Sequence, residues 1–261
     1  TQWEYILNNT HYQMRGNYMN LNKIYEIPPT VRQYNFDGYQ REGYATVLYV
    51  ENDIAVFDQT IFYAESGGQI YDTGSINGNR VISVKKYLGE LSKVKRTDIN
   101  VPSVKINTRI VHEFSKPVDF SVGDVVSMSI DWDRRYKIMK NHTLAHFLFF
   151  GLTILFVNKG IDLFIKGCAI NEEKGSFSLN NKITNEDVDY IEEKILSIYE
   201  PGINIIMHPE EENDEIYYWK FKNIIIPCGG THIKNTDEIS NFKIWRKSEG
   251  KNKSKIYIKA L

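Results

Sequence analysis

Apolar residues are distributed differently in the two halves of the chain. From about residue 41 to residue 130, short runs rich in Val, Ile and aromatic residues alternate with Gly, Asn and Asp, as in "YATVLYV", "RVISVKKY" and "DVVSMSIDW". Such runs, separated by turn-forming residues, are typical of β-strands. Several short strands at this spacing predict a small barrel or sandwich.

Helical spacing of the apolar positions begins near Arg134. The segment "RRYKIMKNHTLAHFLFFGLTILFV" predicts one helix, and "TNEDVDYIEEKILSIYEP" predicts an amphipathic second one. Thr184 is the expected N-cap of the second helix, and Pro201 its expected end. The remaining apolar runs, such as "NIIIPC" and "KIYIKAL", are strand-like. We therefore predict an α+β protein in which a small N-terminal β-barrel precedes helices packed on an antiparallel sheet.

The same patterns predict three segments. Residues 1–36 form an N-terminal extension, residues 37–135 a β-barrel domain with a Gly-rich motif, and residues 136–261 the α+β domain. The chain begins at Thr1, and Met19 is a candidate native start, so residues 1–18 are expected to be an addition to the fold.

The composition indicates a globular protein that functions in a reducing cellular compartment. The chain has 261 residues, of which 42% are hydrophobic, enough to build a core. Its two cysteines cannot form a secreted disulfide framework, so we expect a cytoplasmic protein. The longest apolar run, "HFLFFGLTILFV", is shorter than the roughly 20 residues of a membrane helix. We expect a buried helix there, and no membrane partner.

Charge is segregated along the chain, although the net charge is only −1. Residues 243–259 contain seven Lys or Arg against one Glu, and residues 131–140 contain four against two Asp. Local basic clusters can bind a polyanion even when the whole chain is neutral. The alternative interpretation is an ordinary solvated surface.

Two pairs of metal-binding residues share one spacing. His142 and His146 are four residues apart in the first predicted helix, and Cys228 and His232 are four apart in "PCGGTHIKNT". On a helix, residues i and i+4 lie about 5–6 Å apart on one face, so both histidines can reach one ion. Three imidazoles and a thiolate suit Zn²⁺. Either pair alone is also explained by core packing or chance, but together they favour a metal site.

Two further residues, Thr143 and Cys168, bear on the kind of metal site. Thr143 stands where the His-Glu-x-x-His motif of metallopeptidases has its Glu, which argues against a peptidase of that class. Cys168 is expected to be a small buried residue rather than a further ligand. No P-loop or G-x-G-x-x-G motif is present, so we expect no nucleotide partner.

These motifs resemble those of a known family. "HTLAH" followed by "CGGTH" is similar to the paired metal motifs of the alanyl-tRNA synthetase editing domain and of free-standing AlaX-type editing proteins. "ESGGQIYDTGSI" resembles the family's Gly-rich motif, and the order of the motifs is the family's order. The resemblance covers about residues 40–261. It implies a zinc-dependent hydrolase that deacylates mischarged tRNA(Ala), carrying Ser or Gly, as a separate protein.

The resemblance also implies roles for individual residues. Thr143, Glu65 and Gln69 are the candidate catalytic residues, and Thr143 could instead hydrogen-bond within its own helix. The expected zinc ligands are His142, His146, Cys228 and His232. Candidate substrate contacts are Ser66, Gly67, Gly68, Gly229 and Gly230, where the last two could offer N–H groups to an oxyanion. Candidate tRNA contacts are Arg134, Arg135, Lys137, Lys140, Lys243, Arg246 and Lys247.

Some positions depart from the family pattern, and they leave alternatives open. Ala145 stands where Thr is frequent, Ile165 where Gln is frequent, and Lys255 where the final strand often has Arg. A tRNA-binding module with little hydrolysis is therefore a second hypothesis, and editing of Ser-tRNA(Thr) is a third. Whether zinc activates water or positions the substrate also stays open, as does a homodimer.

Overall fold

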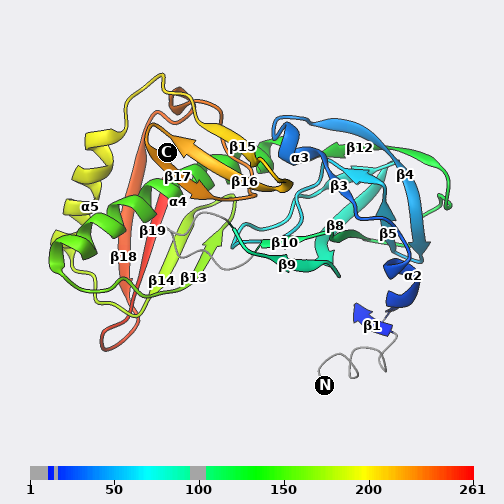
Figure 1. Cartoon of the computed structure of the whole chain (residues 1–261), viewed down its shortest axis with the longest axis horizontal. Coiled ribbons are helices and arrows are strands. Elements are labelled where there is room, and N and C mark those ends of the chain that lie inside the picture. The colour runs from blue at the N-terminus through cyan, green and yellow to red at the C-terminus, as the bar shows by residue number, and fades with distance from the viewer. Residues whose placement is uncertain (1–10, 15–16, 95–103) are drawn as a thin grey trace. The chain divides into compact units, whose positions relative to one another are not determined.

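The computed structural model describes residues 11–14, 17–94 and 104–261 (Figure 1). Contacts divide the chain into two compact units. The first contains the described parts of residues 11–64, 71–93 and 104–130, and the second contains residues 65–70, 94 and 131–261. The Gly-rich motif at residues 65–70 thus belongs to the second unit, although the sequence placed it in the barrel domain. Residues 1–10 of the expected N-terminal addition lie outside the described residues.

The first unit is built on a closed barrel, in the strand order β11-β5-β4-β12-β7-β8. All its pairings are antiparallel, and β11 closes the ring by pairing with both β5 and β8. Between β7 and β8, Asn77 and Gly78 both have positive φ (46° and 77°), as a two-residue hairpin turn requires. The strands are β4 (Glu42–Glu51), β5 (Ile54–Phe57), β7 (Gly74–Ile76), β8 (Asn79–Tyr87), β11 (Arg109–Phe114) and β12 (Val125–Ile130).

Residues before the barrel pack against its core. Met19, Ile24 and Ile27 are buried and share a cluster with Tyr49 and Val56 of the barrel strands. From Met19 onward the segment is therefore part of the first unit, which corrects the prediction of a separate extension. The smaller elements of this unit are β1 (His11–Met14), β2 (Asn17–Asn20), α2 (Leu21–Tyr25), β3 (Val31–Arg32), α3 (Gln33–Phe36), β6 (Gln59–Thr60), β9 (Glu90–Ser92) and β10 (Val104–Ile106).

The second unit contains two antiparallel sheets and two longer helices, so the predicted α+β class is confirmed. The larger sheet has the order β13 (Ile165–Ile170), β14 (Gly175–Leu179), β19 (Ser254–Ala260) and β18 (Phe242–Ser248). The smaller one contains β15 (Ile206–Glu210), β16 (Asn213–Phe221) and β17 (Ile224–Pro227). A short 3-10 turn, η1 (Thr236–Glu238), follows β17.

Helix α4 (Trp132–Lys159) is the central element of the second unit. It packs on β14 and β19 and against α5 (Asn185–Ile198). Gly151 permits the close approach of the two helices, because a Cβ there would lie 2.8 Å from Ile191 Cγ2. By length and composition α4 could cross a membrane, but 67% of its most apolar window is buried inside the protein. It is therefore a core helix, as the sequence predicted.

Helix α5 begins at the predicted N-cap. The Thr184 hydroxyl accepts a hydrogen bond from Asp187 N (3.2 Å), and the Asp187 carboxylate accepts one from Thr184 N (2.9 Å). This reciprocal pair satisfies two backbone donors that the first turn would otherwise leave unpaired. Asp187 also forms a 2.5 Å ion pair with Lys159 at the end of α4, which joins the two helices.

Candidate metal centre

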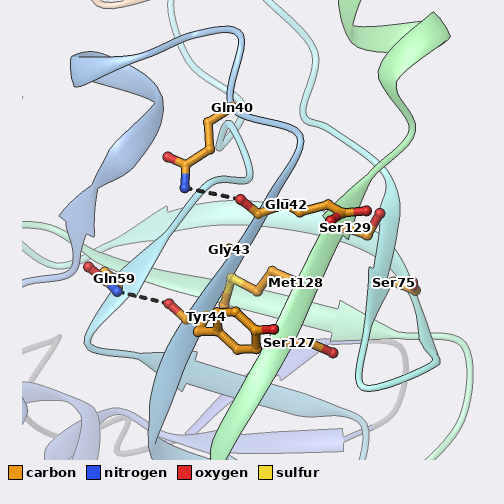
Figure 2. A pocket seen from close by; sticks show the side chains of 9 residues that line it. All are labelled: Gln40, Glu42, Gly43, Tyr44, Gln59, Ser75, Ser127, Met128 and Ser129. Atoms are coloured by element: carbon orange, nitrogen blue, oxygen red, sulfur yellow. Dashed lines mark hydrogen bonds between the residues drawn. The ribbon is translucent and has the colours of Figure 1, made fainter.

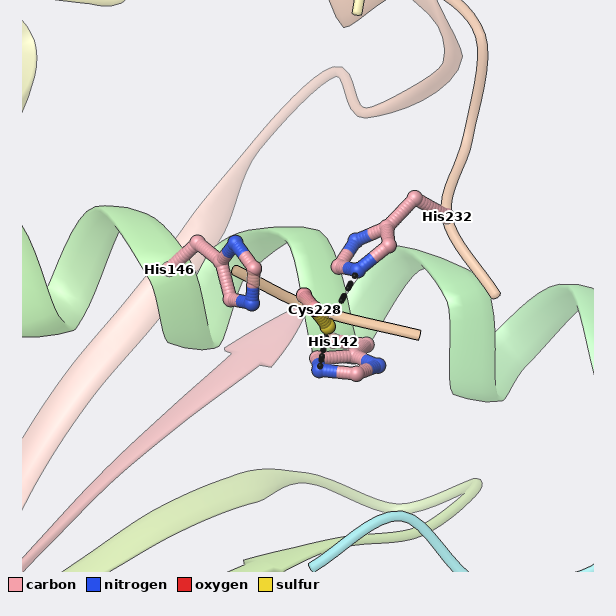
Figure 3. Close-up of side chains that lie close together, drawn as sticks. All are labelled: His142, His146, Cys228 and His232. Carbon is pink, nitrogen blue, oxygen red and sulfur yellow. Dashed lines mark hydrogen bonds between the residues drawn. The ribbon is translucent and has the colours of Figure 1, made fainter. Parts of the chain in front are cut away.

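The structure brings together the four residues predicted as metal ligands (Figure 3). His142 and His146 lie one turn apart on α4, and Cys228 and His232 lie on the loop after β17. One donor atom from each residue lies within 4.8 Å of the others. Cys228 Sγ is 3.5 Å from His142 Nε2 and 3.4 Å from His232 Nε2. The two pairs therefore form one cluster, which a metal ion could occupy.

Two of the imidazoles are oriented by polar side chains behind them. His142 Nδ1 lies 2.7 Å from Gln69 Oε1, and His232 Nδ1 lies 3.1 Å from the Thr143 hydroxyl. The backbone N–H of Thr231 donates to the same Gln69 oxygen (3.0 Å), which fixes that atom as an acceptor. His142 must then carry its proton on Nδ1, so its Nε2 lone pair faces Cys228. Hydrogen bonds of this kind commonly fix the tautomer of metal-binding histidines.

The third imidazole is held mainly by packing. The buried Nδ1 of His146 has no hydrogen-bond partner within the part of the chain that the structure describes. Its ring packs edge-to-face with Trp219 of β16, with centroids 4.7 Å apart, and Trp219 is itself fully buried. Sequence reasoning missed Trp219, because it stands in a run of consecutive buried residues of β16 that has no pattern specific to a metal site.

Burial determines the protonation of the three rings. It lowers the pKa of His142 to about 3. Burial also lowers the pKa values of His146 and His232 well below their ordinary value, and the neighbouring histidines add to this effect. All three imidazoles are therefore neutral at pH 7, the form in which histidine binds metals. A buried cluster of three neutral imidazoles and one thiol fits a metal ion of borderline softness.

The Gly-rich motif forms a tight turn that positions Gln69. Gly67 (φ 59°) and Gly68 (φ 87°) both adopt left-handed conformations. A Cβ on Gly68 would lie only 2.6 Å from the Cys168 carbonyl oxygen, so no larger residue fits there. The turn is closed by hydrogen bonds between Ser66 and Gln69, and Gln69 is fully buried. The motif thus contributes to the cluster through a side chain that holds His142.

Gly229 and Gly230 have different surroundings, although the sequence predicted one role for both. A Cβ on Gly230 would lie 2.2 Å from His142 Cε1, whereas one on Gly229 would meet nothing within 4 Å. The Gly230 N–H also points at Cys228 Sγ (3.4 Å). Gly230 therefore accommodates the His142 ring and supports the thiol, so its N–H is not available for a substrate oxyanion as predicted.

The other predicted site residues lie in varied surroundings. Thr143 is fully buried, and its hydroxyl faces His232. Glu65 is exposed and is not among the clustered donors. Cys168 is partly exposed rather than buried, and it too is outside the donor cluster. Desolvation raises the pKa of the Cys168 thiol to about 12, so it stays protonated at pH 7.

The predicted tRNA contacts include one clear error. Arg135 is fully buried, so its guanidinium cannot reach a nucleic acid. Arg134 is 3.3 Å from Glu172, and Arg246 donates to Asn185 Oδ1 at 3.0 Å. Lys140 lies over the ring of Tyr136, at 4.5 Å. The exposed members of the set are Lys137, Lys243 and Lys247.

A separate pocket of about 610 Å³ lies on the barrel of the first unit (Figure 2). Two side-chain amides beside it donate hydrogen bonds to backbone carbonyls: Gln40 Nε2 to Glu42 O, and Gln59 Nε2 to Tyr44 O. No residue predicted from the sequence as catalytic or metal-binding lines this pocket. Its lining consists of Gln40, Glu42, Gly43, Tyr44, Gln59, Ser75, Ser127, Met128 and Ser129. The clustered histidines and Cys228 are therefore the candidate functional site, rather than this pocket.

Comparison with known proteins supports the likeness seen in the motifs. A family described as "tRNA synthetases class II (A)" matches residues 31–134, and "Threonyl and Alanyl tRNA synthetase second additional domain" matches residues 220–259. The alanyl-tRNA editing protein AlaX-M of Pyrococcus horikoshii is 30% identical over 240 residues, which cover 88% of this chain and 97% of that protein. This chain belongs to the alanyl-tRNA editing protein family.

Full-length ligases are also similar to this member of the editing family. The alanine–tRNA ligase of Aeropyrum pernix is 30% identical over 82% of the chain, and that of Sulfurisphaera tokodaii is 31% identical over 84%. The matched regions cover only 24% and 25% of those ligases. This chain thus corresponds to about a quarter of each of these ligases.

Proposed function

We propose that this member of the alanyl-tRNA editing family is a metal-dependent hydrolase that deacylates mischarged tRNA(Ala) in the cytoplasm. The observation that carries the proposal is the cluster of three buried histidines, His142, His146 and His232, with the partly buried Cys228. The name of the Pyrococcus horikoshii relative refers to alanyl-tRNA editing, which supports tRNA as the partner. Ser-tRNA(Ala) is the preferred substrate in this proposal, and Gly-tRNA(Ala) is the second.

The proposed metal is Zn²⁺, because three imidazoles and one thiolate match its ligand preference. A bound zinc ion supplies Lewis-acid polarisation of an oxygen ligand at neutral pH. The chain's own residues hold that site: Gln69 fixes the tautomer of His142, and Thr143 contacts His232. Gly229 has open space around it and is the remaining candidate for an N–H that faces the substrate.

A panel of charged tRNAs tests the proposal. The purified protein is incubated with Ser-tRNA(Ala), Gly-tRNA(Ala), Ala-tRNA(Ala) and Ser-tRNA(Thr), with and without a chelator, and loss of the ester is followed. We expect chelator-sensitive loss of Ser-tRNA(Ala), with Ala-tRNA(Ala) spared. If the zinc-loaded, folded protein hydrolyses none of these esters, it is a tRNA-binding module and not an enzyme.

The same panel tests the threonine alternative. That alternative is favoured by one observation, since the family that matches residues 220–259 is named for both threonyl and alanyl synthetases. Selective loss of Ser-tRNA(Thr) would establish it in place of our proposal.

A matched pair of cysteine variants tests the metal requirement. Cys228→Ala removes one of the clustered donors, so we expect it to lose both metal and activity. Cys168→Ala removes the protein's other cysteine, which lies outside the donor cluster. We expect the Cys168 variant to retain its metal. Equal metal content in the two variants would contradict the assigned ligand set.

A further inference from the structure

One face of the larger sheet in the second unit carries ordered rows of lysine and aromatic side chains. Along β18 and β19, buried residues such as Ile244 and Ile256 alternate with residues that point to the opposite face. The members of this second set are fully or partly exposed. We call them the lysine–aromatic face; they are Lys243, Trp245, Lys247, Lys255, Tyr257 and Lys259.

The strand register places like residues directly opposite each other. Lys243 pairs with Lys259, Trp245 with Tyr257, and Lys247 with Lys255. The two aromatic rings are stacked, with centroids 5.1 Å apart and planes within 9°. Like charges that face each other across a strand pair destabilise a sheet. One lysine pair lies on each side of the aromatic pair. These pairs therefore reduce the stability of the sheet, unless an anion offsets their charge.

No acidic residue compensates this charge within the sheet. The four strands of the sheet contain six Lys or Arg and no Asp or Glu. None of the four lysines of the face forms an ion pair within the described ranges. The ammonium group of Lys174 also lies 5.3 Å from the Tyr257 ring, which adds a further cation beside the face. The whole chain carries a net charge of −1, so this concentration of positive charge is local.

The lysine–aromatic face is on the side of the sheet away from α4. The side chains of Ile244, Ile256 and Ile258 are buried on the other side, where α4 and α5 pack against β18 and β19. Helix α4 also carries His142 and His146. A partner on the lysine–aromatic face would therefore bind away from the metal ligands.

We propose that the lysine–aromatic face binds the phosphate backbone of the tRNA body, away from the aminoacylated end. This inference rests on the proposed function, which provides an RNA partner. Lysine contacts to phosphates position a nucleic acid without reading its sequence. The exposed lysines of β18 span about 13 Å, since a strand rises about 3.3 Å per residue, so the face contacts several phosphates at once. A second copy of the protein would present the same positive charge, which disfavours self-association through this face.

Salt-dependent binding of uncharged tRNA tests the proposal directly. The test variant is Lys243→Gln/Lys247→Gln/Lys259→Gln. Its control removes the same charge from exposed lysines elsewhere, as Lys85→Gln/Lys116→Gln/Lys220→Gln. Each lost phosphate contact lowers the slope of log affinity against log salt by about 1, so we expect the slope of the test variant to fall by about 3. The control should keep the wild-type slope.

Trp245 supplies a readout that does not depend on charge. It is one of four tryptophans and lies between the two lysine pairs. We expect bound tRNA to change the intrinsic fluorescence of the wild type, and we expect part of that change to disappear in Trp245→Phe. A fluorescence change of equal size in the variant would contradict tRNA binding at this face.

Different outcomes separate this inference from the proposed function. If the protein hydrolyses mischarged tRNA, the test variant should show a raised KM with kcat retained. If hydrolysis occurs but the test variant keeps the wild-type salt slope, tRNA does not bind at the lysine–aromatic face, and the enzyme proposal stands. If no ester is hydrolysed but the slope still falls by about 3, the enzyme proposal fails and the RNA-binding face stands. An equal loss in test and control variants would mean non-specific attraction, and would overturn the proposal.

Discussion

Gly230 offers the sharpest test of how the metal cluster is built. In Gly230→Ala, the added Cβ would lie 2.2 Å from His142 Cε1 and 2.6 Å from its Nδ1. It would also lie 2.8 Å from Gln69 Oε1, the atom that holds this ring. Ordinary contacts of a Cβ begin near 3.4 Å, so the ring must move by about 1.2 Å or the loop must shift by the same amount.

A movement of this size is large for a metal ligand. Ligands must stay within about 0.5 Å of their productive positions, and loss of the partner behind a ligand weakens metal binding about 10–100-fold. We therefore expect Gly230→Ala to bind zinc about 10–100-fold more weakly, a change of about 1.4–2.8 kcal/mol. Stability should change less, because the clash is with the side chains of His142 and Gln69 and not with backbone atoms.

Competition with a chromophoric chelator measures this affinity. Gly229→Ala is the matched control: it adds the same methyl group one residue earlier in the loop, where nothing lies within 4 Å. The control should bind zinc like the wild type. If Gly230→Ala also binds zinc with wild-type affinity, the His142 ring does not depend on the space beside Gly230, and the reasoning is refuted.

Three other predictions follow from contacts elsewhere in the structure. Gln69→Ala removes the hydrogen bond to His142 Nδ1, so we expect about 10–100-fold weaker metal binding, measured by chelator competition. Unchanged affinity would mean that Gln69 is only a turn residue. Burial lowers the pKa of His112 to about 3, so the unfolded state binds more protons between pH 6.5 and 3, and stability is lost as pH falls. Between pH 7 and pH 4.5, denaturant titration should show that the wild type loses about 2.7 kcal/mol more stability than His112→Phe, because the other buried histidines contribute equally to both proteins. Thr184→Ala removes the cap of α5 and should lower the free energy of unfolding by about 1 kcal/mol, whereas the exposed Thr153→Ala should change it little.

Local spacing was sufficient to predict the donors of the cluster. The i,i+4 spacing of His142 and His146 places both side chains on one helix face, and the same four-residue spacing marked Cys228 and His232 as the second pair of donors. The cap at Thr184 was predictable for the same reason, because capping depends on residues three positions apart. Helix faces and helix caps depend on residues that are close together in the sequence, so the sequence alone predicts them.

Contacts between distant residues were not predicted, although the resemblance had marked Gln69 as a candidate site residue. Gln69 contacts His142 across 73 positions and Thr231 across 162, and no periodicity records such contacts. The error at Arg135 was avoidable, however. Arg135 precedes Ile138, Met139 and His142 by three, four and seven residues, so it shares their buried helix face. The prediction counted the charges of this segment without asking which face of the helix each residue occupies, and for Arg135 it was therefore wrong.

The contacts of Gln69 have a further consequence for folding. They join the first third of the chain to its middle, at His142, and to its last fifth, at Thr231, and both bonds meet on one amide oxygen. Contacts between such distant segments form late, because a long loop must close before they contribute. High-affinity metal binding would then appear only after the whole chain has folded. Formation of the helix that carries two of the ligands would not be enough. A nascent or truncated chain with all four donors, but with the turn at Ser66–Gln69 unformed, would hold zinc only loosely.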